Sequence, residues 1–143
     1  TASARGCRDA IAGAHIMALK LRELNESLKS DLEEPLRIGI GIHVGPVIIG
    51  EMGYGQSTSL TAIGDPVNTA SRLEALTKDY GAQLIVSRRV ERYSGLDLGN
   101  HRSDEVQIRG RKEPMEIRVI GDAGDLPDFN TGDQPEKPAR AAE

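Results

Sequence analysis

The sequence contains little cysteine and few aromatic residues. Of its 143 residues, one is Cys, none is Trp, one is Phe and three are Tyr. A single cysteine, Cys7, excludes an intrachain disulfide and a thiolate metal cluster, and it favours a reducing, cytoplasmic setting. Base stacking needs aromatic platforms, and binding to a phosphate backbone needs a basic excess. The scarcity of aromatics and the net charge of −4 therefore argue against a nucleic-acid partner.

Long hydrophobic runs are also missing. No stretch approaches the roughly 20 apolar residues that cross a bilayer, and no signal peptide opens the chain. We therefore expect no direct membrane contact from this segment. The chain begins with Thr1 and not with Met, which indicates a piece of a longer protein and leaves room for a sensor or membrane anchor upstream. The composition, 38% hydrophobic and 28% charged, is typical of one modest soluble domain.

The first third of the chain predicts a helix and then a hairpin. Apolar spacings of three and four predict a helix over about residues 3–31. Its expected buried face consists of Ala10, Ala14, Met17, Leu21, Leu24 and Leu28. Alternation over residues 36–44 predicts a half-buried strand, which we expect to form a hairpin with residues 47–53. Gly39 and Gly41 leave one face of this strand bare, either for a packed helix or for a ligand.

The rest of the chain predicts a second helix and further strands. Residues 54–59 are polar and predict a mobile loop. Asp65 is a good N-cap, Pro66 suits the first helical position and Gly81 suits the end of the helix. The remaining expected elements are a strand over 82–86, a short helix capped by Ser87, and strands over 105–109 and 115–120. This order predicts an α+β domain with a largely antiparallel sheet, and the polar residues 121–143 predict a disordered tail.

The densest chemical signal lies in residues 61–74. On a helix that begins at Pro66, Asn68 and Arg72 share one face near the N-terminus. A helix N-terminus attracts anions, and a guanidinium recognises phosphate oxygens. The pattern therefore indicates a phosphate-binding corner with an amide beside it. The alternative is a surface ion pair for Arg72 and a solvated position for Asn68.

This segment resembles the signature of the class III adenylate and guanylate cyclases of bacterial type. The matching residues are Gly64, Val67, Asn68, Ala70, Arg72, Leu73 and Glu74. Residues 39–47 resemble the hairpin that precedes this helix in the family, and residues 108–114 resemble its final hairpin. The resemblance implies that residues 1–120 are the C-terminal part of a cyclase catalytic domain. The implied fold is a partial ferredoxin-like nucleotide cyclase fold, with a mostly antiparallel sheet, helices on one face and the N-terminal strands missing.

The resemblance also implies an activity. A class III adenylate cyclase converts ATP to 3′,5′-cyclic AMP and pyrophosphate by attack of the 3′-hydroxyl on the α-phosphate. By position, Asn68 matches the residue that orients the ribose, and Arg72 matches the one that stabilises charge on the α-phosphate. Thr61 matches the position that reads the purine edge, where Asp or Thr usually accompanies adenine. Arg111 matches a basic residue that contacts the terminal phosphates, with a plain solvated turn residue as the alternative.

The sequence departs from the family in its metal site. Class III cyclases hold two divalent metal ions, Mg or Mn, on two aspartates of an N-terminal strand and hairpin, which also carries a Lys that contacts the base. None of this motif is present, so we expect the metal ligands outside this chain and an inactive isolated fragment. The three histidines, His15, His43 and His101, show no ligand spacing, and we expect structural roles for them.

The family's sites lie between two subunits, so the resemblance implies ATP and a second cyclase subunit as partners, in a homodimer with composite sites. Two other functions stay open. One is a non-catalytic cyclase-homology module that regulates or dimerises, which the intact Asn68 and Arg72 oppose. The other is a guanylate cyclase, which Thr61 opposes.

Overall fold

The computed structural model describes residues 2–127. Its elements are α1 (Ala2–Ser27), β1 (Ile40–Ile42), β2 (Ile48–Tyr54), β3 (Ser57–Ile63), α2 (Asp65–Tyr80), β4 (Leu84–Ser87), α3 (Arg88–Ser94), β5 (Arg102–Val106), β6 (Met115–Ile120) and a 3₁₀ turn (Ala123–Asp125). This is the expected α+β class. No helix within residues 2–127 has the length and apolar character needed to span a membrane.

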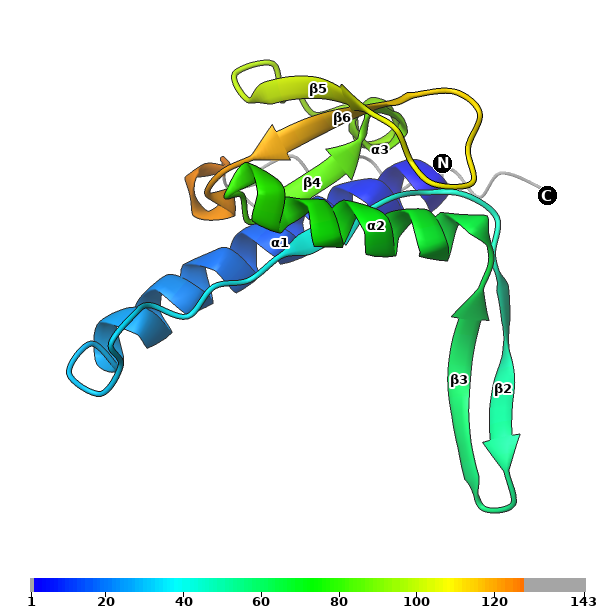
Figure 1. Cartoon of the computed structure of the whole chain (residues 1–143), viewed down its shortest axis with the longest axis horizontal. Helices are drawn as coiled ribbons and strands as arrows, with labels where there is room; N and C mark the ends of the chain where they lie inside the picture. The colour runs from blue at the N-terminus through cyan, green and yellow to red at the C-terminus, as the bar shows by residue number, and fades with distance from the viewer. Residues whose placement is uncertain (1, 128–143) are drawn as a thin grey trace.

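A four-stranded mixed sheet forms the centre of the fold, in the order β1-β4-β6-β5. β1 pairs with β4 in parallel, whereas β4 with β6 and β6 with β5 are antiparallel. Alternate residues of β4 enter two separate cores: Leu84 and Val86 pack with α1 and α3, and Ile85 packs with Leu73 of α2. The expectation of helices on one face is therefore wrong. The sheet lies between α1 with α3 on one side and α2 on the other (Figure 1).

The predicted hairpin between residues 36–44 and 47–53 is also wrong. Only Ile40–Ile42 of the first segment forms a strand, and it pairs with β4. β2 instead pairs with β3, in register from Ile48 opposite Ile63 to Tyr54 opposite Ser57. Residues 57–59, which we expected in a loop, thus belong to a strand. This β2–β3 hairpin projects from the body of the molecule (Figure 1). Because no core buries one face of β3, its sequence lacks the strong apolar alternation by which a strand is predicted.

The bare face of β1 is filled by helix α2. A Cβ atom on Gly41 would collide with the backbone of Ala70 and Glu74, and one on Gly39 would collide with the Thr77 side chain. Of the two readings that the glycines allowed, the structure confirms the packed helix. The two glycines let α2 approach the sheet closely, and this approach fixes the height of its N-terminal half above the strands.

Helix α1 ends at Ser27 and uses a different buried face from the one predicted. Its buried residues are Cys7, Ile11, Ala14, His15 and Ala18. Met17 is 54% exposed and Leu24 is 44% exposed, so only Ala14 of the predicted face is buried. The last turns of α1 extend beyond the sheet (Figure 1), and the described residues leave Ile16, Met17 and Leu24 exposed. The burial of Cys7 raises the pKa of its thiol.

Residues 121–127 contradict the predicted start of a disordered tail. Ala123 is fully buried and Leu126 nearly so, both against the α1 side of the core. The backbone N–H of Ala123 donates to Gln83 Oε1 (2.9 Å), and its carbonyl contacts His15 Nδ1 (2.8 Å). These contacts offset the conformational entropy that residues 121–127 lose on folding. The composition of the segment alone did not predict that it is ordered. The rest of the predicted tail, residues 128–143, lies outside the described residues.

Candidate functional site

The site begins at the N-terminus of α2. Gly64 is the N-cap, with φ of 153°, and Pro66 lies in the first turn. The predicted cap, Asp65, is instead the first helical residue, because Gly64 adopts a backbone conformation that side-chain-bearing residues rarely reach. The predicted stop is confirmed, since Gly81 closes the helix in the left-handed conformation. Pro66 has no N–H, and the N–H groups of Val67 and Asn68 donate to the Gly64 carbonyl at 3.1 and 3.3 Å. What the start of α2 offers an anion is therefore its helix dipole and the N–H of Asp65.

Asn68 and Arg72 both lie on α2, one turn apart. Asn68 is exposed and Arg72 is half-buried. The guanidinium of Arg72 lies beside the turn between β5 and β6, since a Cβ atom on Gly110 would be 3.6 Å from Arg72 Nη1. Gly110 has φ of 90°, which a side chain would strain. This turn therefore passes close enough to α2 to bring a second set of residues to the helix.

Arg111 is that second contribution. Its Nη2 atom lies 3.4 Å from Asp65 Oδ2, with 30% of the Arg111 side chain and 65% of the Asp65 side chain exposed. The turn is held in place because Ile108 is buried in the core beneath α2 and accepts the backbone N–H of Arg111 at 3.0 Å. Such a long, solvated pair is worth little and is easily exchanged for another anion. The structure thus brings Arg72, Arg111 and the start of α2 into one corner, which we call the anion corner.

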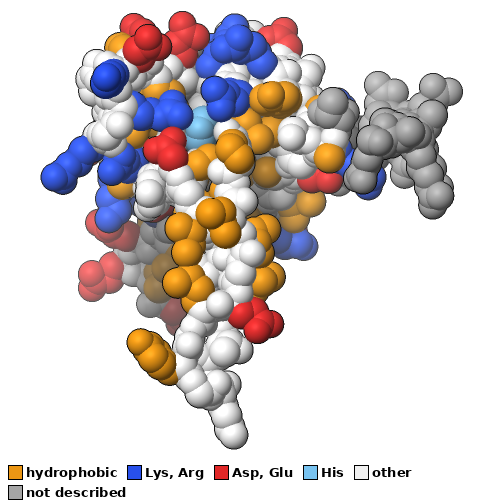
Figure 2. Space-filling model, turned by 90° about the vertical axis from the view of Figure 1, so that its right-hand side faces the viewer, with side chains coloured by type: hydrophobic (Ala, Val, Ile, Leu, Met, Phe, Trp, Pro, Cys, Tyr) orange, Lys and Arg blue, Asp and Glu red, His pale blue; other side chains and the backbone are white. Residues whose placement is uncertain are grey.

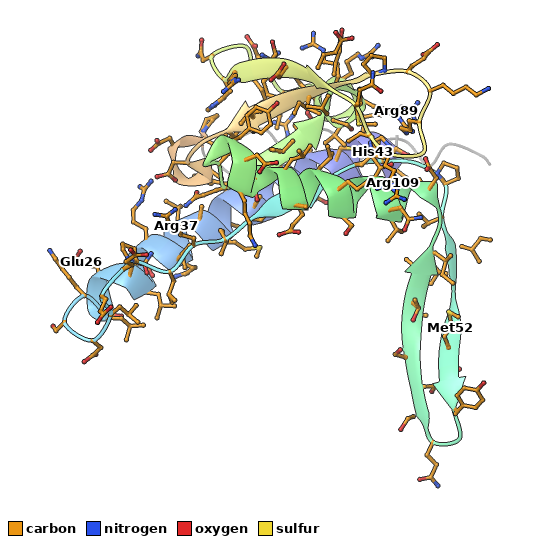
Figure 3. The ribbon with its side chains drawn as sticks, viewed as in Figure 1. Glu26, Arg37, His43, Met52, Arg89 and Arg109 are labelled. Carbon is orange, nitrogen blue, oxygen red and sulfur yellow. The ribbon has the colours of Figure 1, made fainter. Side chains whose placement is uncertain are left out.

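Lys and Arg side chains gather around the anion corner. Figure 2 shows blue side chains around a histidine on the face above the projecting hairpin. Figure 3 shows His43, Arg89 and Arg109 at the end of the molecule where α2 begins. His43 is half-buried, and its pKa is lowered by burial first and then by the charges of Arg111 and Arg89, with Asp65 acting in the opposite direction. The local field therefore favours an added negative charge.

Thr61 stands apart from the other three predicted site residues. It lies on β3 opposite Gly50, half-buried, and its hydroxyl donates a long hydrogen bond to the Ser59 carbonyl (3.4 Å). Within residues 2–127 no hydrogen bond or ion pair joins it to Asn68, Arg72 or Arg111. Thr61 is therefore presented on the hairpin, apart from Arg72 and Arg111.

The described part of the chain does not fit a metal centre. Among residues 2–127 no group of three or more His, Cys, Asp or Glu side chains could hold an ion. Asp65, a carboxylate at the anion corner, pairs with Arg111. Two divalent ions would therefore need ligands from elsewhere.

Two features of the corner escaped sequence reasoning. Arg89 approaches His43 because α3 starts directly after β4, and no sequence pattern predicts that proximity. Ser87 was predicted only as the cap of α3, a role that the structure confirms through Val90 N. It also bonds His43 Nδ1 at 2.7 Å. Only the parallel pairing of β1 with β4 brings those two residues together. The sequence-based prediction paired the first strand with residues 47–53, so it did not include this contact.

The chain is similar to known proteins of one enzyme family. The family profile described as "Adenylate and Guanylate cyclase catalytic domain" matches residues 2–121. An adenylate cyclase of Anabaena cylindrica is 46% identical over 57 residues, and adenylate cyclase 1 of Rhizobium meliloti is 36% identical over 81 residues. These matches cover 40% and 57% of this chain but only 11% and 12% of the relatives. The crystal structure of the guanylyl cyclase Cya2 superposes with a TM-score of 0.68 at 28% identity, covering 87% of this chain and 61% of that one.

Proposed function

Because the chain belongs to the adenylate and guanylate cyclase catalytic domain family, we propose that it supplies half of the active site of an adenylate cyclase. The reaction converts ATP to 3′,5′-cyclic AMP and pyrophosphate. The observation that carries the proposal is the convergence of Arg72 and Arg111 at the uncapped start of α2. Two guanidinium groups and a helix N-terminus make a site for a polyphosphate.

Each residue has a role that its position allows. Asn68, exposed on the face of α2 that Arg72 shares, orients the ribose by its amide. Arg72 donates to the α-phosphate, where negative charge grows as the 3′-hydroxyl attacks and pyrophosphate leaves. A preorganised donor of this kind contributes roughly 3 to 4 kcal/mol to the transition state. Arg111 exchanges its pair with Asp65 for the terminal phosphates.

The family's two divalent ions, Mg or Mn, neutralise the triphosphate when they are bound. The described residues do not fit them, so we place their ligands outside this chain and expect the isolated chain to be inactive. This matches the small share of the curated relatives that the chain spans.

A second cyclase subunit is the proposed partner. The β2–β3 hairpin exposes apolar side chains on both of its faces, with Ile48 75%, Ile49 63% and Leu60 76% exposed. Exposed apolar surface of this extent marks a contact with another molecule. We propose that a second copy covers the hairpin in a homodimer, and that each active site combines residues of two chains.

A guanylate cyclase is the second candidate, favoured by the structural match to the guanylyl cyclase Cya2. The two candidates differ at Thr61, whose hydroxyl we propose reads the purine edge and favours adenine. Cyclisation of ATP and of GTP by the full-length protein separates them. A non-catalytic module would turn over neither nucleotide.

The test of the catalytic role compares two variants on one helix in the full-length protein. Arg72→Ala should lower kcat roughly 10²- to 10³-fold, the loss seen when one transition-state donor is removed. Lys78→Ala, an exposed cation in the last turn of the same helix, should leave kcat unchanged. Equal turnover by both variants would remove Arg72 from the active site.

A further inference from the structure

His43 lies between the sheet and the start of α2. Along this segment Ile40, Ile42 and Val44 pack toward the α1 side of the core. Gly39 and Gly41, on the alternate side, contact α2. Since side chains alternate along a strand, His43 points toward α2. Its neighbour Gly45 contacts Pro66, in the first turn of that helix.

The hydrogen bonds of the imidazole are only half filled. His43 Nδ1 lies 2.7 Å from Ser87 Oγ, which also accepts the backbone N–H of Val90 at 3.4 Å. With one lone pair engaged by Val90, the hydroxyl hydrogen is available to Nδ1, which places the ring's own hydrogen on Nε2. Nε2 is buried and has no hydrogen-bond partner within residues 2–127. A buried ring nitrogen without a hydrogen-bond partner lowers the stability of the fold, so a histidine at this position calls for an explanation.

Charged groups from three elements face this ring. Arg111 comes from the β5–β6 turn, Arg89 from α3 and Asp65 from α2. Burial and the two arginines hold the pKa of His43 below its ordinary value of 6.5, and Asp65 offsets them in part. At neutral pH and with the corner empty, the imidazole is therefore uncharged. The positive charges of Arg111 and Arg89 are one cause of the neutral state of the ring. An anion bound at Arg111 would offset these charges and thereby raise the pKa of His43.

We propose that His43 is a positioning residue of the anion corner, and that its imidazole takes up a proton when a polyphosphate anion binds there. The inference rests on the proposed role of Arg111 in binding the terminal phosphates. The hydrogen bond of the neutral ring joins Ser87, just before α3, to the segment after β1 that lies against α2. The proton that the anion draws onto the ring adds positive charge under the bound phosphates. Anion binding and protonation of His43 therefore strengthen each other.

The experiment uses this chain and inorganic pyrophosphate, the proposed product. The His43 ring protons are followed by NMR from pH 5 to pH 8, with and without saturating pyrophosphate, and are assigned with His43→Asn. We expect the midpoint of the His43 titration to rise by about half a unit to one unit when pyrophosphate is bound. The signal of His101, which lies just before β5 and thus at the end of that strand remote from the turn, controls for ionic strength.

A second readout measures affinity by calorimetry at pH 6 and pH 8. The wild-type chain should gain more affinity at the lower pH than His43→Asn does, and about 3- to 10-fold is the upper limit that a rise of half a unit to one unit in pKa allows. Comparing the two proteins at each pH cancels the protonation of pyrophosphate itself. Asn keeps a group that can accept from Ser87 but cannot gain a proton.

The outcomes separate this inference from the proposed function. Pyrophosphate binding that Arg111→Ala weakens, together with an unmoved His43 titration, overturns the role of His43 and leaves the anion corner intact. Binding that is absent, or that Arg111→Ala leaves unchanged, overturns both. The titration of the wild-type chain decides the matter even if His43→Asn fails to fold.

Discussion

Gly41 of β1 lies directly against the backbone of Ala70 in α2, with no room for a Cβ atom between them. The contact sets the height of the helix that carries Asn68 and Arg72. A methyl group there must push α2 away from the sheet, because backbone atoms cannot rotate aside as a side chain can.

Gly41→Ala should therefore destabilise the chain by about 1 to 3 kcal/mol, the usual cost of overpacking. Gly13→Ala is the matched control, since a Cβ atom on Gly13 of α1 meets nothing within 4 Å. That change should stabilise the chain by up to about 1 kcal/mol, because alanine favours a helix over glycine. Urea denaturation followed by circular dichroism measures both, and equal stabilities would show that α2 yields to a larger residue.

The pair formed by Tyr80 and Asp104 gives a prediction about pH. The Tyr80 hydroxyl donates to Asp104 Oδ2 at 2.6 Å. This bond is the first cause that lowers the pKa of Asp104, followed by the N–H of Glu105. A lowered carboxyl pKa stabilises the fold above the unfolded value, and that contribution is lost as pH falls through the folded value.

Tyr80→Phe should then lower the melting temperature at pH 7, and the difference from wild type should shrink as pH falls below about 3.8, the ordinary pKa of Asp104. Tyr93→Phe is the control, because its hydroxyl has no such carboxylate partner among residues 2–127. A deficit of the same size at every pH would mean that the ionised carboxylate of Asp104 contributes nothing through this bond.

How much of this molecule the sequence predicted depends on what buries each segment. β6 and α3 were predicted closely, because turn and cap residues bound them and their apolar residues face a core inside the chain. The β2–β3 pairing and the exposed part of α1 were missed, because no described residue covers their apolar side chains. Prediction from hydrophobic periodicity assumes that the apolar face of an element is buried within the same chain. At the site, the spacing of Asn68 and Arg72 on one helix could be predicted. The approach of Arg111 and Arg89 could not, since it depends on how distant strands pair.

Thr61 is the residue on which purine selection is predicted to depend. It lies opposite Gly50, where a Cβ atom would meet only open space, so a ligand can reach its hydroxyl from that side of the hairpin. A mispaired polar group costs about 1 to 3 kcal/mol. Thr61→Ala in the full-length protein should narrow the preference for ATP over GTP several-fold in kcat/KM. Thr58→Ala, on the other face of the same hairpin, should leave the preference for ATP unchanged. If both substitutions changed the preference equally, Thr61 would have only a packing role and would not select the purine.

The apolar hairpin should hold the dimer together. Ile48 is 75% exposed and pairs across the hairpin with Ile63, itself 49% exposed. Ile48→Lys places a charge in a surface that we expect a second copy to cover, so it should shift the full-length protein toward monomer in sedimentation analysis without lowering the melting temperature of the isolated chain. Tyr93→Lys, at a less exposed position on α3 (46%), controls for added charge. An unchanged monomer–dimer equilibrium for Ile48→Lys would exclude the hairpin from the interface.

The last prediction is that catalysis needs two chains with different contributions. Asn68, Arg72 and Arg111 lie on this chain, and residues 2–127 hold no metal cluster. The isolated chain should therefore show no cyclase activity with Mg²⁺ or Mn²⁺. In the full-length protein, Arg72→Ala and a variant without the upstream metal ligands should each be nearly inactive. Heterodimers of the two variants contain one site that joins intact metal ligands to an intact Arg72, and one site with both lesions. Their activity should return toward half the wild-type value per dimer. Inactive mixtures in which heterodimers are shown to form would mean that Arg72 acts within its own chain.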